Sequence, residues 1–306
     1  MADGFTIVCG SDERAKWLQH RRSGIGSSDA PAVLGLSPFK SALSVYAEKI
    51  GNFDDEEATE AMKWGRALEP LIIKAFADET TRDVVRGGSL LRSNRWPWML
   101  CTLDASEYSF AEHEFDGAGV LEVKWSNWRV GDWTEGVPKH VWVQFQHQCA
   151  VTGYKWGSVA ALLGSRFVHT DIERDDAFID GVLVPALREF WTRVEGRIPV
   201  SPDGSESSAA ALRALYPEDN GLTVTLPGEF IELDMLRETL LLERKVRDAR
   251  IAEIDQRFKA AIGTATVGVL SNGAQYTYRV QKRSGYEVAP TQFRALRRRA
   301  KGQADA

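Results

Sequence analysis

The sequence has few cysteines, and their positions exclude several classes of metal site. The three are Cys9, Cys101 and Cys149, and no two of them form a Cys-x-x-Cys pair. Zinc ribbons and iron–sulfur clusters need closely spaced cysteines, and small secreted domains need many for disulfides. We therefore expect a reduced protein of the cytoplasm, without a cysteine-held metal.

Targeting, membrane and nucleotide motifs are also missing. The first residues, Met1 to Gly4, carry neither the basic segment nor the apolar run of a signal peptide. No later apolar stretch is long enough to span a membrane. A Gly-x-x-x-x-Gly-Lys-Ser/Thr phosphate loop is absent as well. We expect no membrane association and no built-in ATP-driven motor.

An excess of positive charge is lacking too. The chain has 38 Lys and Arg against 43 Asp and Glu, a net charge of −5. A nucleic-acid function must therefore rest on local basic clusters, because the field at the site matters more than the sum. The hydrophobic content of 43% is ordinary for a globular protein, and 306 residues suffice for one large domain or two modest ones.

The stretch Leu121-Glu122-Val123-Lys124-Trp125 is the centre of the functional prediction. In a strand, Glu122 and Lys124 project to one side while the three apolar residues pack on the other. Asp104 at a neighbouring strand end and Glu69 on a helix would bring three acids beside one lysine. Hard cations such as Mg²⁺ prefer oxygen ligands, so this composition suits magnesium-dependent phosphodiester cleavage. The alternative for Glu122 and Lys124 is a solvated strand face.

Glu69 lies in a helical pattern over about 61–77, directly before Pro70. The proline predicts a bend or a helix restart, which would leave Glu69 at an irregular position. The alternative is an exposed helical glutamate.

A Gly-Ser loop over 23–29 follows a basic helix over 14–22 and precedes a short apolar segment ended by Gly35. Ser28 or Asp29 is a suitable N-cap. Free N–H groups at a helix start attract anions, so with Arg21 the loop could hold a terminal phosphate. The alternative is a plain capped helix after a flexible turn.

Short β-rich runs begin at Asp83, and a helix is predicted over 141–151 with Gln144 and either His147 or Gln148 on its polar side. Four tryptophans, at 125, 128, 133 and 142, surround Arg129 and Lys139; most are expected in the core, with one or two free to stack on bases. The Pro/Ser/Gly-rich segment 196–208 is the best candidate boundary.

The last part of the chain predicts a long helix over 229–262, a hairpin at Asn272-Gly273 and a basic helix over 292–301. The basic helix is either a DNA-backbone contact or a solvated, partly disordered tail. The long helix is open to three uses: an oligomer contact, a partner-docking arm or a wall beside DNA.

Taken in order, five motifs resemble the YqaJ-type viral recombinase family, which includes the phage lambda exonuclease, within the PD-(D/E)xK nuclease superfamily. They are Arg21 with Gly24-Ile25-Gly26-Ser27-Ser28-Asp29, Trp64-Gly65-Arg66-Ala67-Leu68-Glu69, Thr102-Leu103-Asp104, Leu121-Glu122-Val123-Lys124 and Gln144-Phe145-Gln146-His147-Gln148. The resemblance covers about 14–200. Their joint order is far more specific than any single motif.

The resemblance implies an α/β (α+β) fold with a restriction-endonuclease-like core, in which helices flank a mixed central sheet. It implies an exonuclease, dependent on Mg²⁺ with Mn²⁺ as a substitute, that degrades one strand of double-stranded DNA from a 5′-phosphorylated end. The 3′ overhangs would serve phage-type recombination with a single-strand annealing protein. A homotrimer, two metal ions and a location in the bacterial or phage-infected host cytoplasm are further implications.

Residue roles follow from the same resemblance. The metal ligands would be Glu69, Asp104, Glu122 and the Val123 carbonyl, and Lys124 would position or help deprotonate the attacking water. The 5′-phosphate would be held by Arg21, Ser28 and Thr102, and Gln144 would support the site. The family often has proline before the second acid, where this chain has Leu103.

Two alternatives stay open, namely a RecB- or Cas4-like nuclease of other end or structure specificity, and a catalytically silent DNA-end-binding module that recruits an annealing protein. The missing four-cysteine cluster counts against the Cas4-like version. The expected organisation is an exonuclease core over 1–200, a linker over 201–228, and an extension over 229–306 of long helix, β-hairpin and basic helix for DNA contact, oligomerisation or partner docking.

Overall fold

Strand β6 (Ala118–Ser126) is the middle strand of a five-stranded sheet with the order β2-β5-β6-β7-β8. The other strands are β2 (Asp83–Arg86), β5 (Ala105–Tyr108), β7 (Trp156–Leu163) and β8 (Arg166–Glu173). β6 runs parallel to β7, with Glu122 opposite Val159, and the remaining neighbours are antiparallel. The sheet is therefore mixed, as expected.

This computed structural model describes residues 4–10, 13–52, 59–109, 117–126, 133–282, 285 and 294–298. The chain divides into two units, Met1–Pro217 and Glu218–Ala306. The sheet and all the predicted site residues belong to the first unit.

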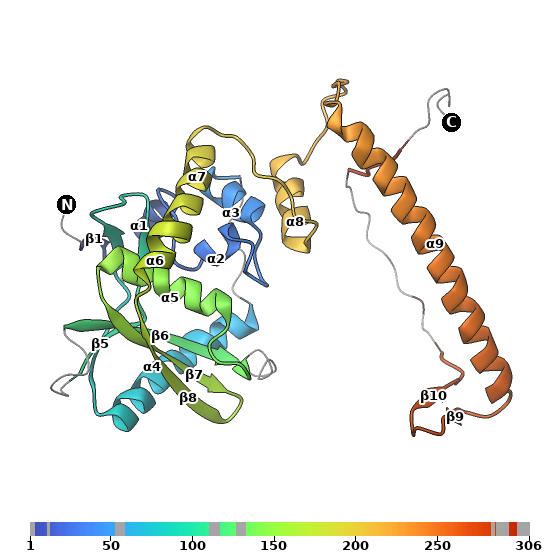
Figure 1. Cartoon of the computed structure of the whole chain (residues 1–306), viewed down its shortest axis with the longest axis horizontal. Coiled ribbons are helices and arrows are strands. Elements are labelled where there is room, and N and C mark those ends of the chain that lie inside the picture. The colour runs from blue at the N-terminus through green and yellow to red at the C-terminus, as the bar shows by residue number, and fades with distance from the viewer. Residues whose placement is uncertain are drawn as a thin grey trace. The chain divides into compact units, whose positions relative to one another are not determined.

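Two helices cover the two faces of the sheet (Figure 1). α4 (Glu60–Thr80) packs Ile72, Ile73 and Phe76 against a cluster that includes Leu121 and Val123. α5 (Lys139–Thr152) lies on the other face, where its apolar residues join the main core with Val120 and Val159. The predicted alternation along β6 is thus confirmed, because neighbouring residues of one strand contact different helices. The expected α/β class with flanking helices is confirmed with it.

The prediction of a helix restart at Pro70 is wrong. α4 is one helix of 21 residues with Pro70 inside it, and it is capped by Thr59, whose side chain accepts from Met62 N at 3.2 Å. Proline removes one helical hydrogen bond. Burial of the apolar residues that follow Pro70 offsets this cost, because packing against a sheet contributes more than a single bond.

A smaller three-stranded sheet and further helices complete the first unit. The strands are β1 (Phe5–Cys9), β3 (Leu90–Ser93) and β4 (Leu100–Thr102), in the order β1-β3-β4. The helices are α1 (Arg14–Arg21), α2 (Ala30–Val33), α3 (Ala42–Lys49), α6 (Asp176–Phe178), a π-helical turn (Ile179–Leu183), α7 (Val184–Glu195) and α8 (Glu206–Leu215). α8 lies within the segment 201–228 that the sequence suggested as a linker, and Ser207 Oγ accepts from Ser41 N at 3.1 Å.

The second unit contains α9 (Glu229–Ile262), a helix of 34 residues, and a hairpin of β9 (Val267–Val269) and β10 (Gln275–Thr277). Gly273 has a φ of 86°, the left-handed geometry that favours Asn-Gly turns. The predicted basic helix over 292–301 is not seen: its described residues, 294–298, form no helix, and the others lie outside the described ranges.

Throughout the described ranges, no helix combines the length and the apolar character that a membrane span requires.

Candidate active site

Glu122 is the acidic residue of the central strand, and its side chain is tightly held. It is 1% exposed, and both carboxylate oxygens accept hydrogen bonds from α5. Gln144 Nε2 donates to Oε1 at 2.8 Å, and Gln148 Nε2 donates to Oε2 at 2.6 Å. The two glutamines are four residues apart, which places them on the same helical face. Helix α5 therefore fixes the orientation of the Glu122 carboxylate.

Lys124 lies beside Glu122, as alternation along the strand predicts. Its ammonium forms an ion pair with Glu122 Oε1 and donates to Gln144 Oε1 at 3.0 Å. Burial alone would lower the pKa of Lys124, but Glu122 and Asp104 raise it above the ordinary value. Lys124 is therefore a fixed positive charge here, suited to orienting a water or a phosphate oxygen rather than to removing a proton.

Asp104 stands at the start of β5, next to the middle of β6. Its Oδ2 accepts from Val123 N at 2.8 Å. The N–H and C=O of one residue in a strand point to the same edge, so the Val123 carbonyl faces this edge too. Burial, and next the charge of Glu122, raise the pKa of Asp104 well above its usual value. The carboxyl groups of Asp104 and Glu122 and the Val123 carbonyl thus lie near one another, where β5 begins beside β6. A cation bound there would reduce the repulsion between the two carboxyl groups.

Glu69 takes a more distant position. It extends from α4 toward β2, where Arg86 Nη2 lies 3.6 Å from its Oε1, and its side chain is 29% exposed. Its charge still acts on both Asp104 and Lys124. Across the described residues, no three His, Cys, Asp or Glu side chains gather closely enough to form a metal cage.

The residues at this edge nevertheless fit Mg²⁺. Magnesium usually takes one or two carboxylates and keeps several waters, which substrate phosphates can replace. Asp104, Glu122 and the Val123 carbonyl offer hard oxygen donors of the required kind. A cage of three acids is not needed for this mode of binding.

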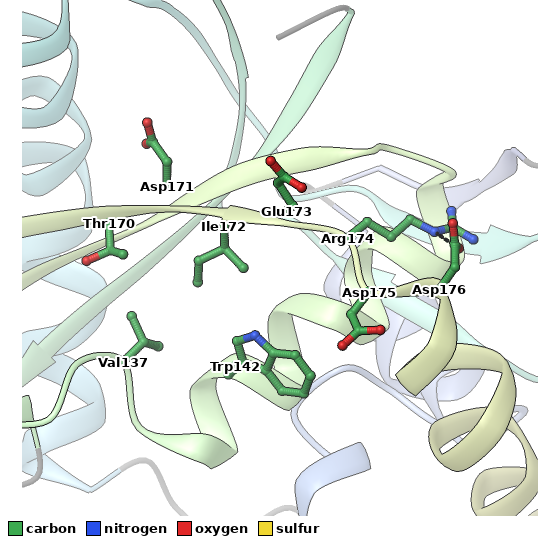
Figure 2. Close-up of a pocket in the computed structure, with 9 residues that line it drawn as sticks. All are labelled: Val137, Trp142, Thr170, Asp171, Ile172, Glu173, Arg174, Asp175 and Asp176. Carbon is green, nitrogen blue, oxygen red and sulfur yellow. Dashed lines mark hydrogen bonds and ion pairs between the residues drawn. The ribbon is translucent and has the colours of Figure 1, made fainter. Parts of the chain in front are cut away.

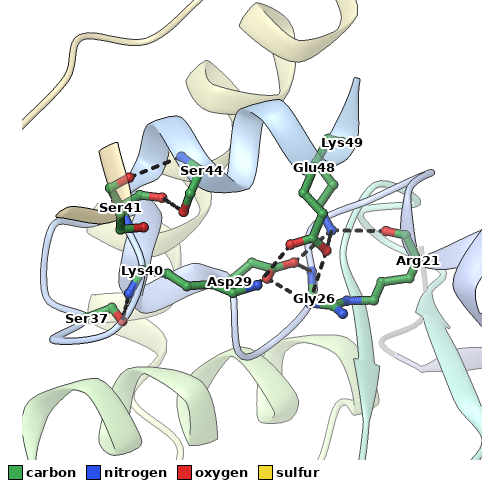
Figure 3. Close-up of polar contacts among 10 residues, drawn as sticks. Arg21, Gly26, Asp29, Ser37, Lys40, Ser41, Ser44, Glu48 and Lys49 are labelled. Carbon is green, nitrogen blue, oxygen red and sulfur yellow. Dashed lines mark hydrogen bonds and ion pairs between the residues drawn. The ribbon is translucent and has the colours of Figure 1, made fainter. Parts of the chain in front are cut away.

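Arg21, one of the predicted phosphate residues, belongs to a cluster of charged side chains that includes Asp29 and Lys49 (Figure 3). Asp29 does not cap α2 through its side chain; its Oδ2 accepts from Gly26 N at 3.1 Å and lies 2.7 Å from Lys49 Nζ. Burial opposes ionisation, but Lys49 and Arg21 hold the pKa of Asp29 well below its usual range. With four residues, α2 is too short to supply the anion-binding helix start that the sequence suggested.

Arg21 is held within this cluster. Its Nη2 lies 3.1 Å from Glu48 Oε1 and 3.4 Å from Asp29 Oδ1, and Lys40 Nζ is 2.9 Å from Glu48 Oε2. Arg21, Lys40 and Lys49 are thus the cations of the cluster among the described residues, and Asp29 and Glu48 are the carboxylates that they contact.

Trp17 connects two predicted phosphate residues. Its indole N–H donates to Thr102 Oγ1 at 3.2 Å, and the Arg21 guanidinium lies 5.4 Å from the centre of its ring. Ser28 is exposed on the loop that ends at Asp29. The structure therefore brings Arg21 and Thr102 to one neighbourhood, although they are far apart in the sequence.

A groove of about 730 Å³ lies elsewhere, along β8 and α5 (Figure 2). Its lining contains four acids, at 171, 173, 175 and 176, and Trp142, which also packs against the main core. Negative lining repels a DNA backbone. Trp125 and Trp133 likewise pack against the core, as expected for most of the four tryptophans, whereas Trp128 and Arg129 lie outside the described residues.

Comparison with known proteins shows which sequences and folds this chain resembles. Residues 16–155 match the family profile described as a YqaJ-like viral recombinase domain. The matched residues are similar to this family and make up a little under half of the chain. A relative, the uncharacterised protein YqaJ of Bacillus subtilis, is 29% identical over 269 residues, which cover 85% of this chain and 81% of the relative.

Two solved structures resemble the chain. An alkaline exonuclease from Laribacter hongkongensis has 22% identity and a TM-score of 0.49, with coverage of 60% of this chain and 94% of that one. A phage-related exonuclease from Haemophilus somnus has 11% identity and a TM-score of 0.44, with coverage of 60% and 99%.

Residues 16–155, which match the family profile, include every predicted site residue, from Arg21 to Gln144, and several that the prediction lacked. Gln148 was expected on the polar side of the helix and in a motif, and Asp29 as a cap and in a motif, but neither was assigned a role in the site. Lys49 and Glu48 carried no distinguishing signal, because a charged pair at a helix end is usually solvated. Burial is what separates them from surface residues, and burial depends on the fold.

Proposed function

We propose that this protein is a magnesium-dependent exonuclease that degrades one strand of linear double-stranded DNA from its 5′ end. The observation that carries the proposal is the hydrogen-bonded set of Glu122, Lys124 and Gln144 beside Asp104 on a central strand edge. The 3′ overhangs left behind would serve recombination by single-strand annealing, in keeping with the viral recombinase description of the matched family.

The residues divide the chemistry between them. Asp104, Glu122 and the Val123 carbonyl would hold Mg²⁺ or Mn²⁺, with Glu69 supplying further negative charge for a second ion. The bound metal would lower the pKa of a coordinated water and offset charge on the scissile phosphate. Lys124, kept protonated by its acidic neighbours, would orient the attacking water and stabilise charge that develops on the phosphate. Gln144 fixes the positions of Lys124 and Glu122 relative to each other, because its side-chain amide hydrogen-bonds to both.

Recognition of a 5′-phosphate would come from Arg21, Ser28 and Thr102. A phosphate held at a constant distance from Asp104 and Glu122 selects the first phosphodiester bond, which explains cleavage from the end. In this proposal the protein works with a single-strand annealing protein, needs no ATP and assembles as a homotrimer around DNA.

The decisive experiment is digestion of a linear duplex labelled separately at each end, with Mg²⁺ or EDTA. We expect mononucleotide release from the 5′-phosphorylated strand alone, abolished by EDTA and by Lys124→Ala. Binding to DNA ends without digestion under Mg²⁺ or Mn²⁺ would instead identify a recruitment module. Equal digestion rates on 5′-phosphorylated and unphosphorylated ends would contradict the proposed recognition of the 5′-phosphate but not the proposed exonuclease activity.

A further inference from the structure

We infer that Gln148 is a positioning residue for the proposed metal-binding carboxylate of Glu122, so this inference rests on the proposed function. Gln148 is fully buried on α5, and its Nε2 donates to Glu122 Oε2 at 2.6 Å. The same nitrogen lies 3.5 Å from the backbone oxygen of Thr102. Within the described residues, the Gln148 amide donates to Glu122 and Thr102 alone, so it would act on the reaction through these two residues.

The acceptor positions of the Glu122 carboxylate show how Gln148 orients it. An ionised carboxylate offers about four lone-pair positions. Among the described residues, Oε1 of Glu122 already accepts from Lys124 and Gln144, whereas Oε2 accepts from Gln148 alone. Oε2 is thus the oxygen with a lone pair left for a cation, and the hydrogen bond from Gln148 sets the direction in which that lone pair points.

The cost of Gln148 to folding argues for a use beyond packing. Within the described residues, its buried Oε1 has no hydrogen-bond partner. A buried polar atom without a partner destabilises a fold, and an apolar side chain of similar size would avoid this. The donated bond to Glu122 is the contact that a leucine could not replace.

Gln148 also connects the two halves of the site. Thr102, whose backbone oxygen lies near Gln148 Nε2, carries the hydroxyl that accepts from Trp17. A single buried amide therefore lies between a proposed phosphate residue and a proposed metal ligand. Its loss is expected to loosen the carboxylate without removing any group that touches DNA.

The test compares Gln148→Leu with Gln146→Leu in the full chain. Gln146 is a matched control, because it is equally buried on α5 but bonds the Glu173 carbonyl at 2.9 Å and Asp175 N at 2.8 Å. Mg²⁺ affinity is measured by calorimetric titration without DNA, and the digestion rate is measured against Mg²⁺ concentration.

For Gln148→Leu we expect Mg²⁺ affinity to fall about tenfold, as for other residues that orient metal ligands, with the rate partly restored by excess Mg²⁺. Gln146→Leu should bind Mg²⁺ like the wild type even where its melting temperature falls. If Gln148→Leu does not fold, Gln148→Asn replaces it in the test, because asparagine keeps the amide on a shorter side chain. Its Mg²⁺ affinity should also fall, but by less than in Gln148→Leu.

Wild-type Mg²⁺ affinity in Gln148→Leu, or in Gln148→Asn where only that variant folds, would overturn the inference, as would an equal loss in Gln146→Leu. Failure of the proposed function looks different: the wild type itself would then neither bind Mg²⁺ nor digest DNA.

Discussion

Replacement of Lys124 by methionine separates metal binding from the chemical step. The ammonium contacts Glu122 Oε1 and Gln144 Oε1, and its side chain is 29% exposed. Methionine keeps most of the length of the side chain and removes the charge together with the donors to Glu122 and Gln144. Loss of one preorganised charge at a reacting phosphate typically lowers kcat about 10²- to 10³-fold, or about 3 to 4 kcal/mol. We expect a loss of this size at saturating Mg²⁺.

Mg²⁺ affinity should respond differently. The positive charge of the ammonium repels a cation bound at Glu122 Oε2, so its removal should leave Mg²⁺ affinity unchanged or raise it. Single-turnover digestion over a range of Mg²⁺ concentrations measures both quantities. Lys74→Met is the control, because Lys74 lies on α4 with a side chain 69% exposed and pairs only with Asp78 in its own helix. A rate within threefold of wild type, or a loss that excess Mg²⁺ fully restores, would refute the role given to Lys124.

Three further predictions concern charge. Burial raises the pKa of Glu107 to about 7 despite its ion pair with Arg82. The native state thus binds the Glu107 proton more tightly than the unfolded chain does. The free energy of unfolding should therefore fall by about 3 kcal/mol from pH 4.5 to 7. Urea unfolding of Glu107→Gln should lack this fall, and parallel curves for both proteins would contradict it. Asp29→Asn leaves the ammonium of Lys49 buried beside a neutral amide and should cost about 3 to 5 kcal/mol in the same assay, whereas a cost below 1 kcal/mol would show that the pair is dispensable. Arg21→Ala should reduce the preference for 5′-phosphorylated over hydroxyl ends at least tenfold in competition digestion, and an unchanged ratio would move phosphate recognition elsewhere.

Local patterns were enough for most of the secondary structure. Alternation predicted that Glu122 and Lys124 share a face opposite Leu121, and the packing of α4 and α5 confirms it. Asn272-Gly273 predicted the hairpin of the second unit. Where local rules failed, tertiary packing competed with them: α4 continues through Pro70 because its second half is buried.

The prediction failed differently at the chain's end. The charges at 294–298 suggested a helix face, but the described residues there form none, and Arg298 pairs with Asp234 of α9 instead. Helix propensity is weak without a buried apolar face, so charge periodicity alone does not determine structure.

By itself the sequence determined the strand, its alternation, and the order of motifs that point to a metal-dependent nuclease. These properties depend on residues two to four positions apart, whose relation is set by backbone geometry. Only the tertiary structure decided that Gln148 holds Glu122, that Lys49 neutralises Asp29, and that Trp17 reaches Thr102. Each of these contacts joins residues at least 20 positions apart, and which side chains become buried together depends on how the helices pack on the sheet.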